Sequence, residues 1–494
     1  MPPCRNRFAQ VSTRDGAVCC EPRGKGAPAS KPCHPFNIFL RPDPWPHLRS
    51  NINTCAQLLL RAIGSEHTAS QAGQNYFQFV GRLQRFESFK RNDSSMAYTG
   101  TGPVAGPRAL SEAPTAFAPT VNDAPLLPTG FPDVLDSSMA WAGTDFAKHS
   151  DFILRLNDVD IKEAEEALEH FKGSTALQPL SGVPADGRVT ALGLDGDLMS
   201  RQSFPLPNLG PRLDRFRLNL HDGTGFGLIR GLDPQRYAVE DLTMLHLGIQ
   251  CYIANRQGRQ DKKGNMLVHI VADNSSRERA NHHRHSTAPI TFHNEEAGDI
   301  ISWLTRSTAA TGGKCIIASA YTVYNVLAAS RPDLVRTLAR SDWPFALPRF
   351  QCRPVIFYHQ GRLITNFGRT ALLGSSSYAR SERLPKLNSS QTEALDAIES
   401  IARATQLEIA TQAGDMHFIN NLAVLHRREG FVDGEAPTER RHLVRMRLRD
   451  DDMGWAIPAD LALEWTKAFA PGRARTWHLE PMPDGFFPLR TQPN

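Results

Sequence analysis

Two histidines that lie far apart in the chain, His293 and His426, carry most of the chemical information in this 494-residue sequence. His293 is followed two residues later by a carboxylate, Glu295, in the segment Phe-His-Asn-Glu. A histidine–x–carboxylate pair followed much later by a second histidine is the ligand order of the facial triad that binds non-heme Fe(II), and this triad leaves the opposite metal positions open for a cosubstrate and O2. The sequence therefore predicts His293, Glu295 and His426 as metal ligands and as catalytic residues.

The carboxylate of this pair has a neighbouring rival, Glu296. Side chains two residues apart on one strand point to the same side, which favours Glu295 if both ligands lie on a strand. A shift of one residue in the loop would bring Glu296 to the metal instead. An isolated His-x-Glu is more often a surface histidine beside acidic residues, and the distant second histidine is what favours a metal site here.

An arginine-rich segment, residues 440–445, lies about 15 residues beyond His426. A guanidinium pairs with a carboxylate through two hydrogen bonds and stays charged when partly buried, so Arg441 is predicted to anchor the distal carboxylate of 2-oxoglutarate. Arg445 would share a face with Arg441 if the segment is a strand, where it supports Arg441 or meets an anionic substrate. Together with the triad, this predicts an oxygenase that consumes 2-oxoglutarate as a cosubstrate.

Many short strands, separated by loops and flanked by helices, must position these residues. Helices are expected at residues 160–171, 206–221, 240–254, 322–329, 332–340 and 390–405. Strands are expected at residues 225–231, 266–271, 300–304, 314–319, 355–358, 362–367, 407–411, 416–419 and 442–449. This pattern is typical of a mainly β fold with flanking helices (α+β) and a double-stranded β-helix or jelly-roll core. The sequence contains no G-x-G-x-x-G or P-loop motif that would favour a nucleotide-binding sheet.

Composition divides the chain into an extension and a domain. Residues 1–137 are rich in Pro, Gly, Ala and Ser and are expected to be disordered or weakly ordered, and Met96 is an alternative start of the protein. An oxygenase domain is expected over residues 138–485, with a helical lead-in at 138–224 and the jelly-roll core at 225–485, before a tail at 486–494.

Charge and cysteine content exclude several classes of partner. The formal net charge of +5 gives no basis for nucleic-acid binding, and no aromatic-interleaved basic stripe supports it. No apolar run approaches the roughly 18 residues that span a membrane. The cysteines after residue 55 are scattered, as expected in a reducing compartment, and the early ones lack paired zinc-binding spacing. We therefore expect a cytoplasmic enzyme with a small-molecule substrate and O2, and homo-oligomerisation stays open.

Residues 140–483 resemble the taurine dioxygenase-like (TauD/TfdA) family of Fe(II)/2-oxoglutarate-dependent oxygenases, especially its fungal, clavaminate synthase-like members. The matching stretches are residues 225–233, 258–269, 292–300, 311–319, 366–369, 414–421 and 440–445. The resemblance implies a jelly-roll fold, with His293 and His426 as Fe(2+) ligands and Arg441 as the 2-oxoglutarate anchor.

Two positions depart from the family pattern. Members usually carry His-x-Asp, whereas this chain has Glu295 and a loop that is one residue longer. A Thr or Ser commonly follows the Gly-Gly turn and hydrogen-bonds 2-oxoglutarate, whereas this chain has Cys315 there. A thiol is a weak donor, so cosubstrate affinity is expected to be lower.

Two further groups of polar residues lie near the predicted ligands. His282, His283 and His285 precede the triad and are expected to form a mobile polar lid over the pocket, with a second metal site as the alternative. Asn420 and Asn421 are expected to orient His426, because metal-ligating histidines need such partners.

The predicted reaction is hydroxylation or desaturation of a small organic substrate, with release of succinate and CO2. The alternatives are a catalytically silent jelly-roll binding module and a zinc-dependent hydrolase that uses two histidines and a glutamate. The family that the chain resembles acts on sulfonates, sulfate esters, aryloxyacids, amino acids and specialised metabolites. The resemblance therefore implies a role in catabolism or in secondary metabolism.

Overall fold

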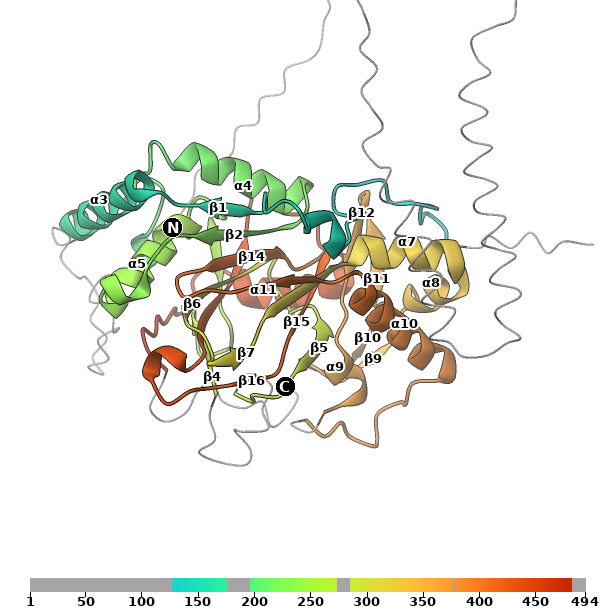
Figure 1. Cartoon of the computed structure of the whole chain (residues 1–494). Helices are drawn as coiled ribbons and strands as arrows, with labels where there is room; N and C mark the ends of the chain where they lie inside the picture. Colours follow the sequence, from blue (N-terminus) through green and yellow to red (C-terminus); the bar gives the residue numbers. More distant parts are fainter. Residues whose placement is uncertain (1–126, 176–195, 273–284, 376–377, 482–494) are drawn as a thin grey trace, which may run out of the picture. The chain divides into compact units, whose positions relative to one another are not determined.

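The computed structural model describes residues 127–175, 196–272, 285–375 and 378–481 (Figure 1). All of them belong to one compact unit, residues 47–494. The predictions for residues 1–126, including Met96, for His282 and His283, and for the tail lie outside the described residues.

Two β-sheets form the core of this unit. The strands of the larger, seven-stranded sheet are β1 Ile153–Arg155, β2 Phe226–Arg230, β3 Arg256–Gly258, β4 Val268–Val271, β6 Ile300–Ser307, β14 Met416–Asn420 and β17 His442–Arg449. Their order is β1-β2-β14-β6-β17-β3, with β4 paired to β17. The strands of the smaller sheet are β5 Ile290–His293, β8 Cys315–Ser319, β13 Leu407–Ile409 and β15 Val424–Arg428, in the order β13-β8-β15-β5. All of these pairings are antiparallel except β1 with β2.

The two sheets pack face to face. Ile301, Trp303 and Leu443 of the larger sheet share one hydrophobic cluster with Ile317 and Val424 of the smaller sheet. Alternation along β17 explains this packing, because Leu443 belongs to this cluster while Val444, Met446 and Leu448 belong to the cluster on the opposite face. This is the two-sheet jelly-roll core that the sequence predicted.

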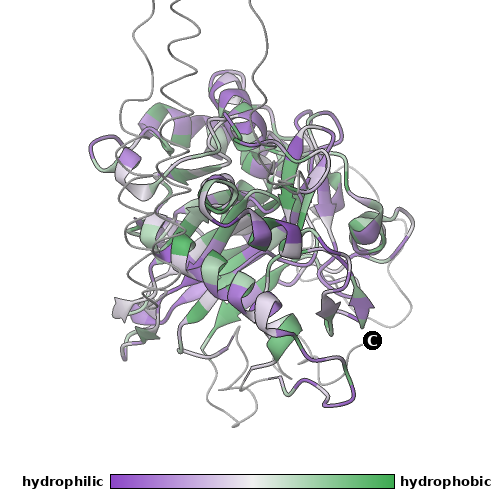
Figure 2. Cartoon of the chain, turned by 90° about the vertical axis from the view of Figure 1, so that its right-hand side faces the viewer, coloured by the Kyte–Doolittle hydropathy of each residue, from purple (hydrophilic) through white to green (hydrophobic). Residues whose placement is uncertain are grey.

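Helices cover the outer faces of both sheets (Figure 1). Helices α3 Asp158–Thr175, α4 Gly210–Asp222 and α5 Val239–Gln250 contribute to a hydrophobic cluster with β2, β6, β14 and β17 of the larger sheet. Helices α7 Ala320–Ser330, α8 Pro332–Leu338 and α10 Ser389–Thr405 share another cluster with β5, β8 and β15 of the smaller sheet. Figure 2 shows hydrophobic residues along the central strands and a mixture of hydrophobic and hydrophilic residues along the helices.

Local sequence sets the ends of these helices. Asn388 and Gln391 form a reciprocal capping box that starts α10, and Ser319 accepts a hydrogen bond from Thr322 at the start of α7. The remaining elements are β7 Thr311–Gly312, β9 Pro344–Phe345, β10 Gln351–Cys352, β11 Ile356–His359, β12 Arg362–Thr365, β16 Phe431–Val432, α9 Arg369–Leu373, α11 Ala459–Phe469, and the 3-10 turns Gly143–Phe146, Gly196–Leu198, Pro234–Arg236 and Pro437–Glu439.

The expected helices and strands are present, with ends shifted by a few residues. The sequence reading missed four strands of the two sheets, β1, β3, β5 and β15, of which β5 and β15 carry the two histidines. It also missed the two-residue strands β7, β9, β10 and β16 and the helices α9 and α11. Residues 127–137, which precede the boundary expected at residue 138, contribute Leu127 and Leu135 to a hydrophobic cluster of the domain. Leu135 is buried there, and its backbone exchanges hydrogen bonds with the Asn325 side chain. No helix in the described part of the chain combines the length and the apolar character that crossing a membrane requires.

Candidate active site

Antiparallel pairing of β5 with β15 places His293 directly opposite His426. Their ring centroids are 4.2 Å apart. Ligand atoms of His293, Glu295 and His426 all lie within 4.8 Å of one another, and the described residues contain no second cluster of this kind. The three predicted ligands, contributed by distant segments, are therefore close enough to share one ion.

The two imidazoles are prepared for ligation in different ways. His293 Nδ1 donates to the carbonyl oxygen of Thr291 at 2.9 Å, and because a carbonyl can only accept, the proton is on Nδ1 and Nε2 is the nitrogen whose lone pair can ligate a metal. The Nδ1 atom of His426 is buried and has no hydrogen-bond partner. Burial, and then the neighbouring His293, hold the pKa of His426 well below its usual value, so this ring is neutral as a metal ligand must be.

Glu295 lies beyond the end of β5, in a loop. His293 and Glu295 therefore do not share a strand, which differs from the arrangement that their spacing predicted. The side chain of Asn421 holds this loop. Its Oδ1 accepts from the Glu295 backbone N–H at 2.8 Å, and its Nδ2 donates to the carbonyl oxygens of Glu295 at 3.0 Å and Gly298 at 3.1 Å. This reciprocal clamp fixes the backbone that presents the carboxylate.

The prediction that Asn420 and Asn421 orient His426 is wrong. Asn421 bonds to the Glu295 loop, and Asn420 bonds to the backbone of Leu220 and Leu422. Asn420 ends β14 and Asn421 begins the turn to β15, and their side chains bond to different elements.

Asn294, the residue between the two ligands, is a positioning residue that the sequence reading missed. Its Nδ2 donates to the carbonyl oxygen of Asn421 at 2.7 Å, and its Oδ1 accepts from the Phe367 N–H at 3.1 Å. It therefore ties the loop both to the turn before β15 and to the segment after β12. A polar amide between two candidate ligands was the available sequence signal.

Two buried arginines of β17 bracket the Glu295 carboxylate. Arg445 Nη1 forms an ion pair with Glu295 Oε1, and Arg447 Nη2 lies 3.9 Å from Glu295 Oε2. Arg447 Nη2 also lies 3.6 Å from Glu296 Oε2. Glu296 therefore faces Arg447 and is not part of the three-residue cluster, so the geometry favours Glu295 as the carboxylate ligand.

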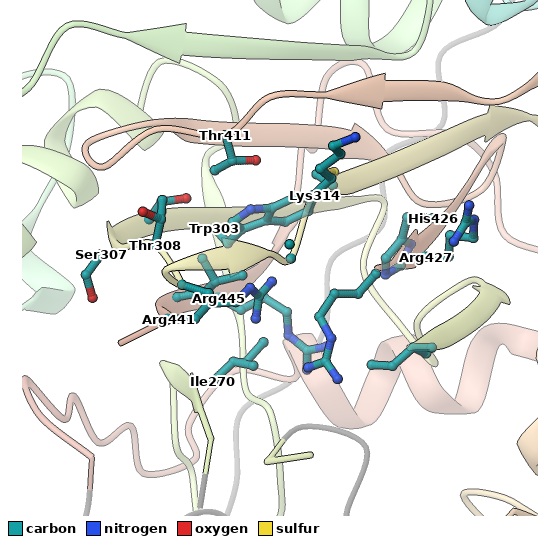
Figure 3. Close-up of a pocket in the computed structure, with 18 of the residues that line it drawn as sticks. Ile270, Trp303, Ser307, Thr308, Lys314, Thr411, His426, Arg427, Arg441 and Arg445 are labelled. Atoms are coloured by element: carbon teal, nitrogen blue, oxygen red, sulfur yellow. The ribbon is translucent and has the colours of Figure 1, made fainter. Parts of the chain in front are cut away.

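A cavity of about 310 Å³ lies between the two sheets next to this cluster. All six predicted site residues line it: His293, Glu295, His426, Arg441, Arg445 and Cys315. Its other walls include Ile270, Ile301, Trp303 and Leu443, which are apolar, and Thr305 and Thr411, which are polar. Figure 3 shows Ile270, Trp303, His426, Arg441 and Arg445 around this pocket.

Arg441 precedes β17 and is nearly enclosed, with 9% of its surface exposed. Its guanidinium carbon lies 5.3 Å from the centre of the Phe431 ring, and its Nη1 has no hydrogen-bond partner. Burial lowers the pKa of Arg441 to about 10, so it is a cation at neutral pH. A Cβ atom on Gly313 would lie 3.2 Å from Arg441 Cδ, which shows how closely the backbone of the Gly-Gly turn approaches this side chain.

Cys315 begins β8 and pairs in register with Arg428, the last residue of β15. Burial raises the pKa of the Cys315 thiol to about 12, so it is neutral. Arg428 also lines the cavity, and the sequence reading missed it. Its position two residues after His426 on a strand was the available signal, because alternate residues share a face.

His285 is buried and its Nδ1 contacts the carbonyl oxygen of Val271 at 3.2 Å. Among the described residues it belongs to no metal-ligand cluster, and its two partners in the alternative second metal site lie outside the described residues. The polar lid stays a prediction.

Comparison with known proteins places the chain in a family. Residues 188–447 match the family model "Taurine catabolism dioxygenase TauD, TfdA family". The taurine hydroxylase-like protein SAT17 of Stachybotrys chartarum is 33% identical over 362 residues, which cover 71% of this chain and 89% of that protein. Among solved structures, the asparagine oxygenase complex with Fe(II), 2S,3S-3-hydroxyasparagine and succinate has a TM-score of 0.45 at 16% identity and covers 62% of this chain and 99% of its own. The non-heme iron oxygenase OrfP with Fe and alpha-ketoglutaric acid has a TM-score of 0.44 at 15% identity, covering 60% and 94%. The sequence matches, together with the clustered residues, show that the chain belongs to the TauD, TfdA dioxygenase family.

Proposed function

We propose that the protein is an Fe(II)- and 2-oxoglutarate-dependent dioxygenase that hydroxylates or otherwise oxidises a small organic substrate and releases succinate and CO2. The observation that carries this proposal is the meeting of His293, Glu295 and His426 within 4.8 Å, beside a cavity that Arg441 also lines. Membership in a dioxygenase family supports it.

The donor set fits ferrous iron. Two neutral imidazoles and one carboxylate are the ligands of the facial triad. The Nδ1 atom of His426 is buried without a hydrogen-bond partner, and ligation of an ion, or rotation of the ring toward one, would remove the cost of this unpartnered atom. When bound, the iron supplies the redox chemistry that couples O2 and 2-oxoglutarate decarboxylation to oxidation of a C–H bond. The protein supplies the binding groups, their orientation and a largely apolar cavity.

Arg441 is the proposed anchor for the distal carboxylate of 2-oxoglutarate. It is buried, cationic and has one nitrogen without a partner, and the backbone at Gly313 supports its side chain. A carboxylate is the natural acceptor for such a guanidinium, because two parallel charge-assisted bonds form between planar groups. Cys315 lines the same cavity as a neutral thiol and would contribute only a weak hydrogen bond to the cosubstrate.

The positive charge of Arg445 favours a substrate that carries a negative charge. Its present partner is Glu295, and an ion bound to Glu295 would compete with Arg445 for that carboxylate. The cavity wall carries Arg428, Arg441 and Arg445 beside the carboxylate of Glu295, so a divalent ion and a dianionic cosubstrate would leave an excess of positive charge. A substrate with a carboxylate, sulfonate or sulfate group would reduce this excess, and the cavity of about 310 Å³ restricts it to a small molecule.

Succinate release tests the proposal. Purified protein with Fe(II), 2-oxoglutarate and O2 is expected to form succinate, and a panel of sulfonates, aryloxyacids and amino acids is expected to include compounds that accelerate it. His426→Ala serves as the control, since it removes one ligand. Absence of succinate under all conditions would support the binding-module alternative, and turnover that ignores 2-oxoglutarate would support the zinc hydrolase. The cytoplasmic location, a role in secondary metabolism, the clavaminate synthase-like branch and homo-oligomerisation stay predictions.

A further inference from the structure

A second buried arginine stands beside Arg441 at the same end of the cavity. Arg428 has 6% of its surface exposed, and its guanidinium carbon lies 4.9 Å from the centre of the Phe431 ring. The guanidinium carbon of Arg441 lies 5.3 Å from the centre of the same ring. Both arginines line the cavity, so two cationic side chains lie together on the part of its wall next to Phe431.

Neither cation has a full set of polar partners in the protein around it. Arg428 Nε and Arg441 Nη1 are buried and have no hydrogen-bond partner, and neither guanidinium forms an ion pair with a described carboxylate. The nearby Asp433 accepts a hydrogen bond from the Arg441 backbone N–H through its Oδ1. Two buried positive charges without an ion-paired carboxylate are costly, and a bound anion would offset this cost.

We propose that Arg428 is a second anchor for the distal carboxylate of 2-oxoglutarate, so that two guanidiniums hold this group. The inference rests on the proposed function. A carboxylate offers about four acceptor positions, so a fork from Arg441 leaves capacity for a donor from Arg428. Arg428 is also the cross-strand partner of Cys315. The Cys315 thiol is a weak hydrogen-bond donor, so Arg428 would supply the cosubstrate with a charged donor beside a side chain that binds it only weakly.

A purely structural role for Arg428 makes a different prediction. Its Nη2 donates to the carbonyl oxygens of Ser286 and Ala288, in the segment that leads into β5 and His293. Such a staple would affect every ligand of the site equally, because it acts through the position of β5. A cosubstrate anchor affects only ligands that carry the distal carboxylate.

The test compares 2-oxoglutarate with 2-oxopentanoate, which has the same chelating end and lacks the distal carboxylate. Binding of each to protein loaded with Mn(II) is measured by anaerobic calorimetry, so no turnover is needed. Arg428→Gln is expected to weaken 2-oxoglutarate roughly 10- to 100-fold, the effect of one hydrogen bond to a charged group, and to leave 2-oxopentanoate unchanged. Arg428→Lys keeps the charge and is expected to give a smaller loss.

Arg259→Gln is the matched control. Arg259 is 5% exposed and its Nη2 also donates to two backbone carbonyl oxygens, those of Lys467 and Ala470, but it does not line the cavity. It is expected to leave both affinities unchanged. Equal weakening of both ligands by Arg428→Gln, or no weakening of either, would overturn the inference.

Arg441→Gln gives an independent readout if the Arg428 variants do not fold. With Arg428 as a second anchor, this variant still prefers 2-oxoglutarate over 2-oxopentanoate. If it binds the two ligands equally, Arg428 is not an anchor. Failure of the wild-type protein to bind 2-oxoglutarate at all would refute the proposed function and the inference with it, whereas wild-type binding that is insensitive to Arg428 would refute the inference alone.

Discussion

Replacing Asn421 with alanine tests how the loop that carries Glu295 is held. The substitution removes three hydrogen bonds of 2.8, 3.0 and 3.1 Å between a side chain that is 1% exposed and the backbone of Glu295 and Gly298. At about 1 kcal/mol for each bond, the free energy of unfolding should fall by about 3 kcal/mol. Substitution of a residue that orients a metal ligand typically weakens metal affinity by about 10- to 100-fold, so Asn421→Ala should weaken metal binding to that extent.

The assay pairs two measurements on two neighbouring variants. Urea denaturation gives the free energy of unfolding, and anaerobic calorimetry gives the affinity for Fe(II) or Mn(II). Asn420→Ala is the control, because Asn420 is equally buried and its two hydrogen bonds go to Leu220 and Leu422. It should lose about 2 kcal/mol of stability by the same reasoning, with no change in metal affinity.

The contrast between the two variants decides the matter. Asn421→Ala with wild-type metal affinity would show that the clamp on Glu295 is unnecessary for ligation. Equal loss of metal affinity in both variants would show that general destabilisation, and not the position of Glu295, controls the site.

Three other predictions follow from the same geometry. His426→Ala removes one of three ligands and should abolish Fe(II) binding in a calorimetric titration; wild-type affinity would exclude His426 as a ligand. Cys315→Thr replaces a weak donor by a hydroxyl and should tighten 2-oxoglutarate binding about two- to tenfold; unchanged affinity would show that this position does not contact the cosubstrate. Burial lowers the pKa of His221 to about 4, of His246 to about 3 and of His417 to about 4, so these rings are neutral in the folded protein. These histidines take up protons near pH 6.5 in the unfolded chain but not in the folded protein. The free energy of unfolding should therefore be highest above pH 6.5 and fall below it by about 1.4 kcal/mol per pH unit for each histidine, until the pKa values of the folded protein are reached. Urea denaturation at pH 7.5 and 5.5 checks this, and equal stabilities would contradict it.

Much of the site could be predicted from the sequence, because the ligand order and the arginine segment are patterns of residue types. His293, Glu295, His426 and Arg441 were selected by residue type and spacing, and the structure places all four on the wall of one cavity. The choice between Glu295 and Glu296 could not be made, since it depends on the path of a loop that Asn421 and Asn294 hold through tertiary contacts.

The strands that carry the histidines were harder to predict. Strand β5 is four residues long, and β15 ends in His-Arg-Arg, so polar site residues interrupt the apolar pattern that marks a buried strand. The contacts of Arg445 and Arg428 could not be predicted from the sequence. Each contact joins distant segments, because Arg445 pairs with Glu295 and Arg428 donates to the carbonyl oxygens of Ser286 and Ala288.

Titration of 2-oxoglutarate into anaerobic, Fe(II)-loaded protein is the most direct test of a metal centre built from His293, Glu295 and His426. Chelation of ferrous iron by a 2-oxo acid produces a visible charge-transfer absorption. We expect this absorption to rise and saturate for the wild-type protein and to be absent for His426→Ala. No absorption in the wild-type protein, or the same absorption in both proteins, would contradict the assignment of these three residues as the iron site.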